Sequence, residues 1–147
     1  MSRSLCLLLP CLVLAACATT PSDKELVIAN TNICAHVESH GSLSYDIPVR
    51  LNQCFGTKSQ EWAAKNGTFA NSSGLCLTAE GGQTQNLTPV IAAQCDGSAS
   101  QQWQASGGHL VGPGGKCLDV AGGDVAEGSQ LVINACGTGA SQQWQVQ

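Results

Sequence analysis

Histidine and carboxylate side chains would carry metal chemistry in this 147-residue chain, so their spacing is the first question. The segment His36-Val37-Glu38-Ser39-His40 has the composition of a two-histidine, one-carboxylate metal site. In an extended strand, however, side chains four positions apart are separated by about 13 Å, which is too far for one ion. We therefore expect a polar loop there, and neither a metal nor another cofactor in this chain.

The residues of nucleophilic catalysis are present without their usual arrangement. No histidine stands beside a serine or cysteine nucleophile in a recognisable pattern. One pair of carboxylates, Asp119 and Asp124, lies around a single turn, where a likeness to a glycosidase pair would be accidental. The sequence thus predicts no catalytic residue and no enzyme.

The N-terminal segment has the pattern of an export signal. Arg3 precedes an apolar run that ends in small residues, too short and wrongly flanked for a membrane span. The segment Leu14-Ala15-Ala16-Cys17 resembles the lipobox of bacterial lipoproteins, in which the cysteine is diacylated and becomes the new N-terminus. The resemblance implies a signal peptide over residues 1–16, then a lipidated Cys17 and a tether over residues 17–25. Ordinary cleavage after Ala16-Cys17-Ala18 is the alternative.

One short segment occurs three times along the chain. The letters ASQQWQ occur at residues 99–104 and again at 140–145, and a weaker copy, SQEW, occurs at 59–62. The three tryptophans, Trp62, Trp103 and Trp144, are the only ones in the protein, and 41 residues separate each from the next. A fixed period of this size indicates a repeat architecture.

Six cysteines follow the same period. They are Cys34, Cys54, Cys76, Cys95, Cys117 and Cys136. No CxxC spacing supports a zinc site, whereas six cysteines in an exported domain indicate three disulfides. Fifteen pairings exist, but equivalent repeats should pair equivalently. We expect Cys34–Cys54, Cys76–Cys95 and Cys117–Cys136.

Each repeat is expected to form about four short strands. In each repeat, side chains should alternate between the two faces of the strand that precedes the second cysteine. The residues expected to point to the core are Val49, Leu51, Val90, Ala92, Leu131 and Ile133. By the same alternation Leu118 and Val120 point inward, while Asp119 points away from the core. Three four-stranded units with nothing left over favour a closed barrel of three-fold pseudosymmetry, which has no exposed sheet edges.

The Gln-x-Trp triplets resemble those of ricin B-type lectin domains. They are Gln60/Trp62, Gln101/Trp103 and Gln142/Trp144, each after a cysteine pair. The resemblance covers residues 26–147 and implies an all-β β-trefoil of three repeats of about 41 residues. It also implies that the three tryptophans are core residues.

The same resemblance implies where a sugar would bind. Lectin sites of this family combine an outward carboxylate two positions after the first cysteine, amides, and an aromatic ring two positions before the second cysteine. The carboxylate position holds His36, Thr78 and Asp119, and the aromatic position holds Asn52, Ala93 and Asn134. The third repeat is therefore the expected site. Its carbohydrate-binding residues would be Asp119, Asn134 and Gln142, without a stacking ring. A solvated surface Asp119 and a purely structural Gln142 are the alternatives.

Charge narrows the range of partners. The sequence has six basic and ten acidic residues and no basic cluster, which argues against nucleic acid. The leading prediction is a non-catalytic, lipid-anchored carbohydrate-binding protein of the bacterial cell envelope, on its periplasmic or cell-surface face. Its partners would be a glycan or polysaccharide and, through the lipid, the membrane. The alternative is an envelope lipoprotein that uses the trefoil as a scaffold for a protein partner.

Overall fold

One succession of four strands occurs three times along the chain. The computed structural model of the protein describes residues 23–38 and 46–147. The predicted signal peptide (residues 1–16), Cys17 and His40 lie outside the described residues.

The strands of each repeat follow one another without interruption by an α-helix. The first repeat (residues 26–65) comprises β2 (Leu26–Ile28), β3 (Ile33–Val37), β4 (Ile47–Gln53) and β5 (Trp62–Lys65). The second (residues 68–106) comprises β6 (Thr68–Ala70), β7 (Leu75–Ala79), β8 (Thr88–Gln94) and β9 (Gln104–Ser106). The third (residues 109–146) comprises β10 (His109–Val111), β11 (Cys117–Val120), β12 (Leu131–Asn134) and β13 (Trp144–Val146).

Short 3₁₀ turns supply the remaining regular structure. They are η1 (Lys58–Gln60), η2 (Glu80–Gly82), η3 (Ala99–Gln101), η4 (Pro113–Gly115), η5 (Ala121–Gly123) and η6 (Ala140–Gln142). Within residues 23–38 and 46–147 there is no α-helix, so the predicted all-β class is confirmed. It follows that no helix of the described part is long and apolar enough to cross a membrane.

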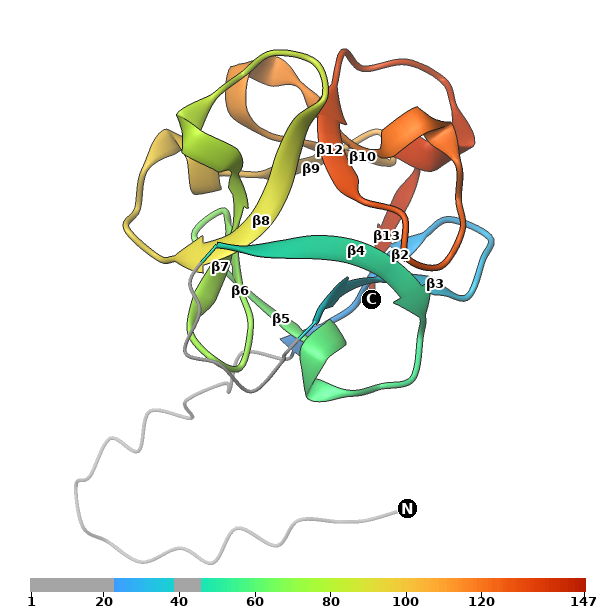
Figure 1. The fold of residues 1–147 in the computed structure, drawn as a ribbon, viewed down its shortest axis with the longest axis horizontal. Coiled ribbons are helices and arrows are strands. Elements are labelled where there is room, and N and C mark those ends of the chain that lie inside the picture. Colours follow the sequence, from blue (N-terminus) through green and yellow to red (C-terminus); the bar gives the residue numbers. More distant parts are fainter. Residues whose placement is uncertain (1–22, 39–45) are drawn as a thin grey trace, which may run out of the picture.

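Three hairpins meet at one end of the molecule. They are β3–β4, β7–β8 and β11–β12, each closed by antiparallel pairing. Their second strands, β4, β8 and β12, form the three sides of a triangle around the pseudo-three-fold axis (Figure 1). Strand β8 pairs with both β4 and β12, and an isolated bridge between Arg50 and Gln130 links the remaining side.

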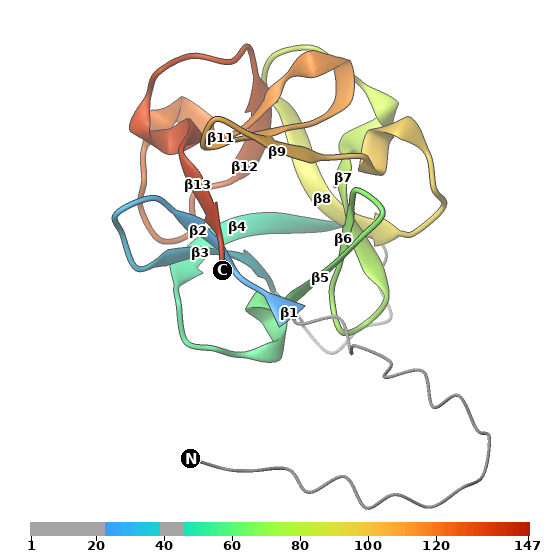
Figure 2. The ribbon, with the colours of Figure 1, turned by 180° about the vertical axis from the view of Figure 1, so that it is seen from behind.

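Three further strand pairs form the opposite end. These are β13–β2, β5–β6 and β9–β10, all antiparallel (Figure 2). The pair β13–β2 joins the last strand of the chain to the first repeat. The predicted β-trefoil is confirmed.

The three repeats share one apolar core, to which each contributes one tryptophan. Trp62, Trp103 and Trp144 are at most 5% exposed and belong to a single cluster. Each indole Nε1 donates a hydrogen bond to the backbone carbonyl that follows a first cysteine by one position. The acceptors are Ala35 (3.4 Å), Leu77 (2.9 Å) and Leu118 (3.0 Å). The indole thus fills the core and satisfies its only donor, as a buried tryptophan requires.

The predicted core face of each hairpin is also confirmed. The core includes Val49, Leu51, Val90, Ala92, Leu131 and Ile133. The alternate residues Asn52, Ala93 and Asn134 lie outside this cluster and are half-buried.

The disulfides lie within the repeats, as predicted. The bonds Cys34–Cys54, Cys76–Cys95 and Cys117–Cys136 join Cα atoms 5.1, 5.1 and 5.0 Å apart. Each one ties the start of a hairpin to the segment that follows it. Disulfides that close loops of 19 or 20 residues stabilise a fold by about 3 kcal/mol each in the chain-entropy model.

The folded part begins earlier than the sequence predicts. Strand β1 (Asp23–Lys24) pairs with β5, although residues 17–25 are the predicted tether. Glu25 and Gln147 exchange two backbone hydrogen bonds of 2.8 and 3.0 Å. Residues 23–25 therefore belong to the domain, because Asp23 and Lys24 pair with β5 and Glu25 pairs with Gln147.

Candidate functional site

Asp119, the carboxylate of the third repeat, is buried although its side chain points away from the core. Asp119 lies on β11 between Leu118 and Val120, which both belong to the core. Turn η6 packs against β11 and leaves Asp119 only 7% exposed. The prediction that Asp119 points away from the core is therefore right, and the alternative of a solvated surface carboxylate is wrong.

Both oxygens of Asp119 accept hydrogen bonds from the protein. Oδ1 accepts one from the backbone N–H of Val120 at 2.7 Å. Oδ2 accepts one from Nδ2 of Asn134 at 2.9 Å and one from Nε2 of Gln142 at 3.0 Å. The hydroxyl of Ser141 also lowers the pKa of this carboxyl. The three predicted site residues are thus in direct contact, and Ser141 joins them.

These bonds decide the protonation state of the site. Burial alone would raise the pKa of the Asp119 carboxyl, but the hydrogen bonds from Asn134, Ser141 and Gln142 outweigh burial and hold the pKa below its usual value. The carboxylate is therefore ionised at neutral pH. An ionised carboxylate is purely an acceptor, and it suits a ligand that brings hydroxyl donors.

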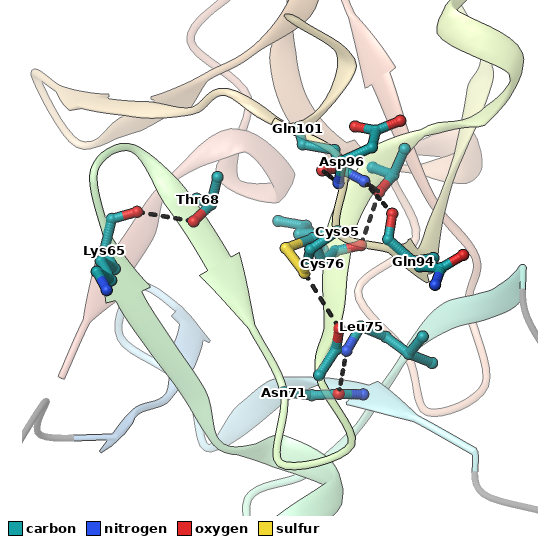
Figure 3. Close-up of a disulfide and its surroundings, with 12 residues drawn as sticks. Lys65, Thr68, Asn71, Leu75, Cys76, Gln94, Cys95, Asp96 and Gln101 are labelled. Carbon is teal, nitrogen blue, oxygen red and sulfur yellow. Dashed lines mark hydrogen bonds between the residues drawn. A yellow bond between two sulfur atoms is a disulfide. The ribbon is translucent and has the colours of Figure 1, made fainter. Parts of the chain in front are cut away.

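Gln142 has a structural duty that all three repeats share. Its Oε1 accepts a hydrogen bond from the N–H of Gly137, and its Nε2 donates one to the carbonyl of Ala135. Gln60 and Gln101 make the same two bonds around Cys54 and Cys95. Figure 3 shows the second of these clamps, in which Gln101 lies between Gln94 and Asp96 beside the Cys76–Cys95 disulfide.

The clamp limits what Gln142 has left for a ligand. One proton of Nε2 goes to Ala135 and the other to Asp119, so both are used inside the protein. Gln142 orients the carboxylate. The repeated glutamine was visible in the sequence, but the direction of its amide depends on the chain fold around the second cysteine.

Asn134 links the carboxylate to the neighbouring repeat. Its Oδ1 accepts a hydrogen bond of 2.9 Å from the backbone N–H of Leu87, which belongs to the second repeat. One proton of its Nδ2 goes to Asp119, and no other bond of this group occurs among the described residues. Oδ1 of Asp119 and the second proton of Asn134 are therefore the polar groups most available to a ligand.

The equivalent positions of the other two repeats carry different chemistry. Thr78 is buried, donates to the carbonyl of Cys76 and accepts from Gln101. Burial lowers the pKa of His36, while the charge of Glu38 opposes that shift. The Nδ1 of His36 is buried and has no hydrogen-bond partner among residues 23–38 and 46–147. Neither position supplies a carboxylate, and His40 of the segment considered for a metal lies outside the described residues.

Glu25, Cys34 and Cys54 bring three ligand-type atoms within 4.8 Å of one another. Both sulfurs belong to a disulfide, so this group offers no thiolate to a metal.

Two surface hollows lie away from Asp119. One, of about 390 Å³, extends between the β5–β6 hairpin and the Cys76–Cys95 disulfide. The other, of about 460 Å³, lies beside Gly67, Trp103 and Gly112. Neither of these two hollows is lined by Asp119, Asn134 or Gln142.

Solved structures show where this architecture occurs. A designed three-fold symmetric protein, ThreeFoil, is 26% identical, with a TM-score of 0.75 over 84% of this chain and 96% of its own. A non-toxic homologue of type II RIPs from Momordica charantia, in complex with α-methyl-D-galactoside, is 25% identical, with a TM-score of 0.70 over 86% of this chain and 48% of its own.

An earthworm R-type lectin C-half in complex with GalNAc is 12% identical and shows the fold alone. Its TM-score is 0.66 over 84% of this chain and 95% of its own. A search of curated proteins found none that matches this sequence.

The family comparison covers more than half of the chain. A model of the ricin-type beta-trefoil lectin domain matches residues 16–103, which include the first repeat and nearly all of the second. The structure adds the third repeat, with the same strands, disulfide and glutamine clamp. The chain therefore belongs to the family of ricin-type β-trefoil lectin domains.

Proposed function

We propose that this chain is a non-catalytic carbohydrate-binding protein of the bacterial cell envelope, with its sugar site in the third repeat. The observation that carries the proposal is the Asp119 carboxylate. It is ionised, is oriented by Asn134, Ser141 and Gln142, and occupies a position where the other repeats hold His36 and Thr78.

Each residue of the site has a distinct role. Oδ1 of Asp119 accepts hydrogen bonds from sugar hydroxyls, and the second Nδ2 proton of Asn134 donates to a hydroxyl oxygen. Gln142 positions the carboxylate and does not itself donate to the sugar, because its Nε2 is already bonded to Ala135 and Asp119. Because Asn134 replaces an aromatic ring, the affinity should be weak. Stacking on such a ring contributes on the order of 1–2 kcal/mol.

The test is a sugar titration of the mature chain from residue 17, with Cys17→Ser to remove the lipid. The probes are α-methyl-D-galactoside, N-acetyl-D-lactosamine and GalNAc, sugars that accompany structures with this fold. In NMR spectra, the chemical-shift changes of backbone amides on addition of sugar should cluster at Asp119 and Asn134. A chain that shows no response to these sugars, nor to an array of other glycans, would overturn the proposal.

Asp119→Thr is the variant that isolates the carboxylate. Threonine occupies the equivalent position of the second repeat, where Thr78 is accommodated by the same glutamine clamp, so the fold should tolerate it. We expect this variant to lose sugar binding. Asp124→Asn is the matched control, since it removes a carboxylate from the adjacent turn and should bind as the unmodified chain does.

The scaffold function is the alternative, and the burial of Asp119 and the lack of an aromatic ring favour it. Asp119 is 7% exposed, and no aromatic ring occupies position 52, 93 or 134. A scaffold would capture one envelope protein in a pull-down that free sugar does not compete. Unchanged capture by Asp119→Thr, together with no glycan response, would favour the scaffold over the lectin.

A further inference from the structure

One turn has the same unusual backbone in all three repeats but a different residue in each. The residue two positions before Pro48, Pro89 and Gln130 has a positive φ: Asp46 (67°), Leu87 (67°) and Gly128 (84°). Glycine adopts this left-handed conformation freely, and aspartate tolerates it. Leucine does neither, so the second repeat carries a residue that its backbone disfavours.

Packing does not compensate Leu87 for that conformation. Its side chain is 63% exposed, one of the two large apolar side chains of the described residues that are open to solvent. Leucine at this position therefore combines backbone strain with an apolar side chain in water. A strained residue without a structural benefit points to a function at its surface.

The place of Leu87 indicates what that function is. Its N–H donates to the carbonyl of Ile133 and to Oδ1 of Asn134, both at 2.9 Å. The amide of Asn134 then reaches Oδ2 of Asp119, also at 2.9 Å. A single amide group thus separates the backbone of Leu87 from the carboxylate.

A second bond fastens the same turn to the third repeat. Oδ1 of Asn86 accepts a hydrogen bond of 2.9 Å from the N–H of Ala135, the residue that follows β12. Together with the bonds of Leu87, it holds the turn of the second repeat against the end of β12. The exposed leucine is therefore fixed beside the site of the third repeat.

We propose that Leu87 of the second repeat supplies the apolar surface of the sugar site whose carboxylate is Asp119 in the third repeat. The inference rests on the function proposed above and names its ligand class: a pyranoside with a C–H face next to adjacent hydroxyls. The hydroxyls bind Asp119 and Asn134, and the C–H face lies on Leu87. The asparagine at position 134 holds both partners, which a ring at that position would not do.

The other two interfaces between repeats lack this combination. Gly128 docks on the first repeat through its N–H and the carbonyl of Leu51, 2.7 Å away, beside a site that holds His36. The segment of Asp46 docks on the second repeat through the pairing of Ile47 with Ala92, beside Thr78. A carboxylate and an exposed apolar side chain meet at the third-repeat site alone among those that the structure describes.

The test uses two substitutions that keep the backbone N–H of Leu87. Leu87→Gly removes the side chain and the strain, and Leu87→Asn replaces it with a polar side chain that tolerates the left-handed conformation. In the titration with α-methyl-D-galactoside, N-acetyl-D-lactosamine and GalNAc, both variants should bind about tenfold more weakly. Leu87→Gly should also raise the Tm, by roughly 2–4 °C, because strain is relieved.

The control is Phe55→Ser, since Phe55 is equally exposed (64%) but lies in the first repeat, which holds His36 at the position of Asp119. It should leave the affinity unchanged. Saturation transfer from sugar C–H protons to the Leu87 methyl groups in the unmodified chain would support the contact directly.

The outcomes separate the two proposals. If both Leu87 variants bind as tightly as the unmodified chain while Asp119→Thr does not bind, the role of Leu87 is overturned and the sugar site stands. If Asp119→Thr binds normally, or if the unmodified chain binds no sugar, the proposed function fails and the role of Leu87 fails with it.

Discussion

Asp119 is buried and yet charged, because the hydrogen bonds that its carboxylate accepts outweigh the cost of removing it from water. The residue type and its place after Cys117 were readable from the sequence. Its surroundings were not, since Asn134, Ser141 and Gln142 come from segments 15 to 23 positions away. Alternation along a strand gave the direction of the side chain correctly, but alternation says nothing about the turn η6 that covers it.

The lowered pKa of Asp119 predicts how stability depends on pH. A carboxyl group whose folded pKa lies below its unfolded pKa of about 3.9 stabilises the fold above that unfolded value. The contribution is lost as pH falls through the folded pKa. The difference in unfolding free energy between the unmodified chain and Asp119→Thr should therefore be constant near pH 7 and shrink below about pH 4. Urea unfolding at both pH values measures it, and an equal difference at pH 3 would contradict the charged, hydrogen-bonded carboxylate.

At the scale of the elements, close backbone packing decides where glycine is required. A Cβ on Gly112 would lie 2.3 Å from Cζ3 and 2.4 Å from Cε3 of Trp103, so the indole of the second repeat lies directly on the backbone of the third. The 41-residue period predicted a buried indole. It did not predict that ring's neighbour, because positions 71 and 30, one and two periods before Gly112, hold asparagine.

Gly112→Ala should therefore displace the Trp103 ring and destabilise the fold by about 1–3 kcal/mol or more, as overpacking does. Urea unfolding, monitored by tryptophan fluorescence, measures the loss of unfolding free energy. Gly137→Ala is the matched control, since its Cβ would meet only Oε1 of Gln142 at 4.0 Å and its φ is ordinary. Equal stabilities of the two variants would contradict the contact between Gly112 and the ring.

For the whole molecule, we expect each of the three disulfides to contribute about equally to the free energy of unfolding. Their disulfides close loops of 20, 19 and 19 residues. Replacing both cysteines of any one pair with alanine should cost about 3 kcal/mol, nearly the same for each pair. Guanidinium unfolding of the three double variants tests this. A much larger loss in one repeat would show that this repeat holds the trefoil together more than the others do.

The N-terminal segment yields a prediction that concerns the molecule in its cell. If Cys17 is diacylated, the full-length protein should sediment with membranes and incorporate labelled fatty acid, since two or more acyl chains anchor a protein stably. Cys17→Ser should abolish both. A soluble mature protein that begins after Ala18 would instead support ordinary signal cleavage.

The architecture could be predicted from the sequence, because a period of 41 residues leaves few ways to bury three tryptophans and pair six cysteines. Repeated positions have equivalent surroundings, so one pattern predicts three cores and three disulfides at once. Only the tertiary structure decided what lies between repeats. Gln130, for example, donates from one Nε2 to carbonyls of Val49, Val90 and Leu131, which belong to three different repeats. The contact of Leu87 with Asn134 is of the same kind, since it depends on which turn of one repeat meets which strand of the next. The period along the chain does not encode this packing between repeats.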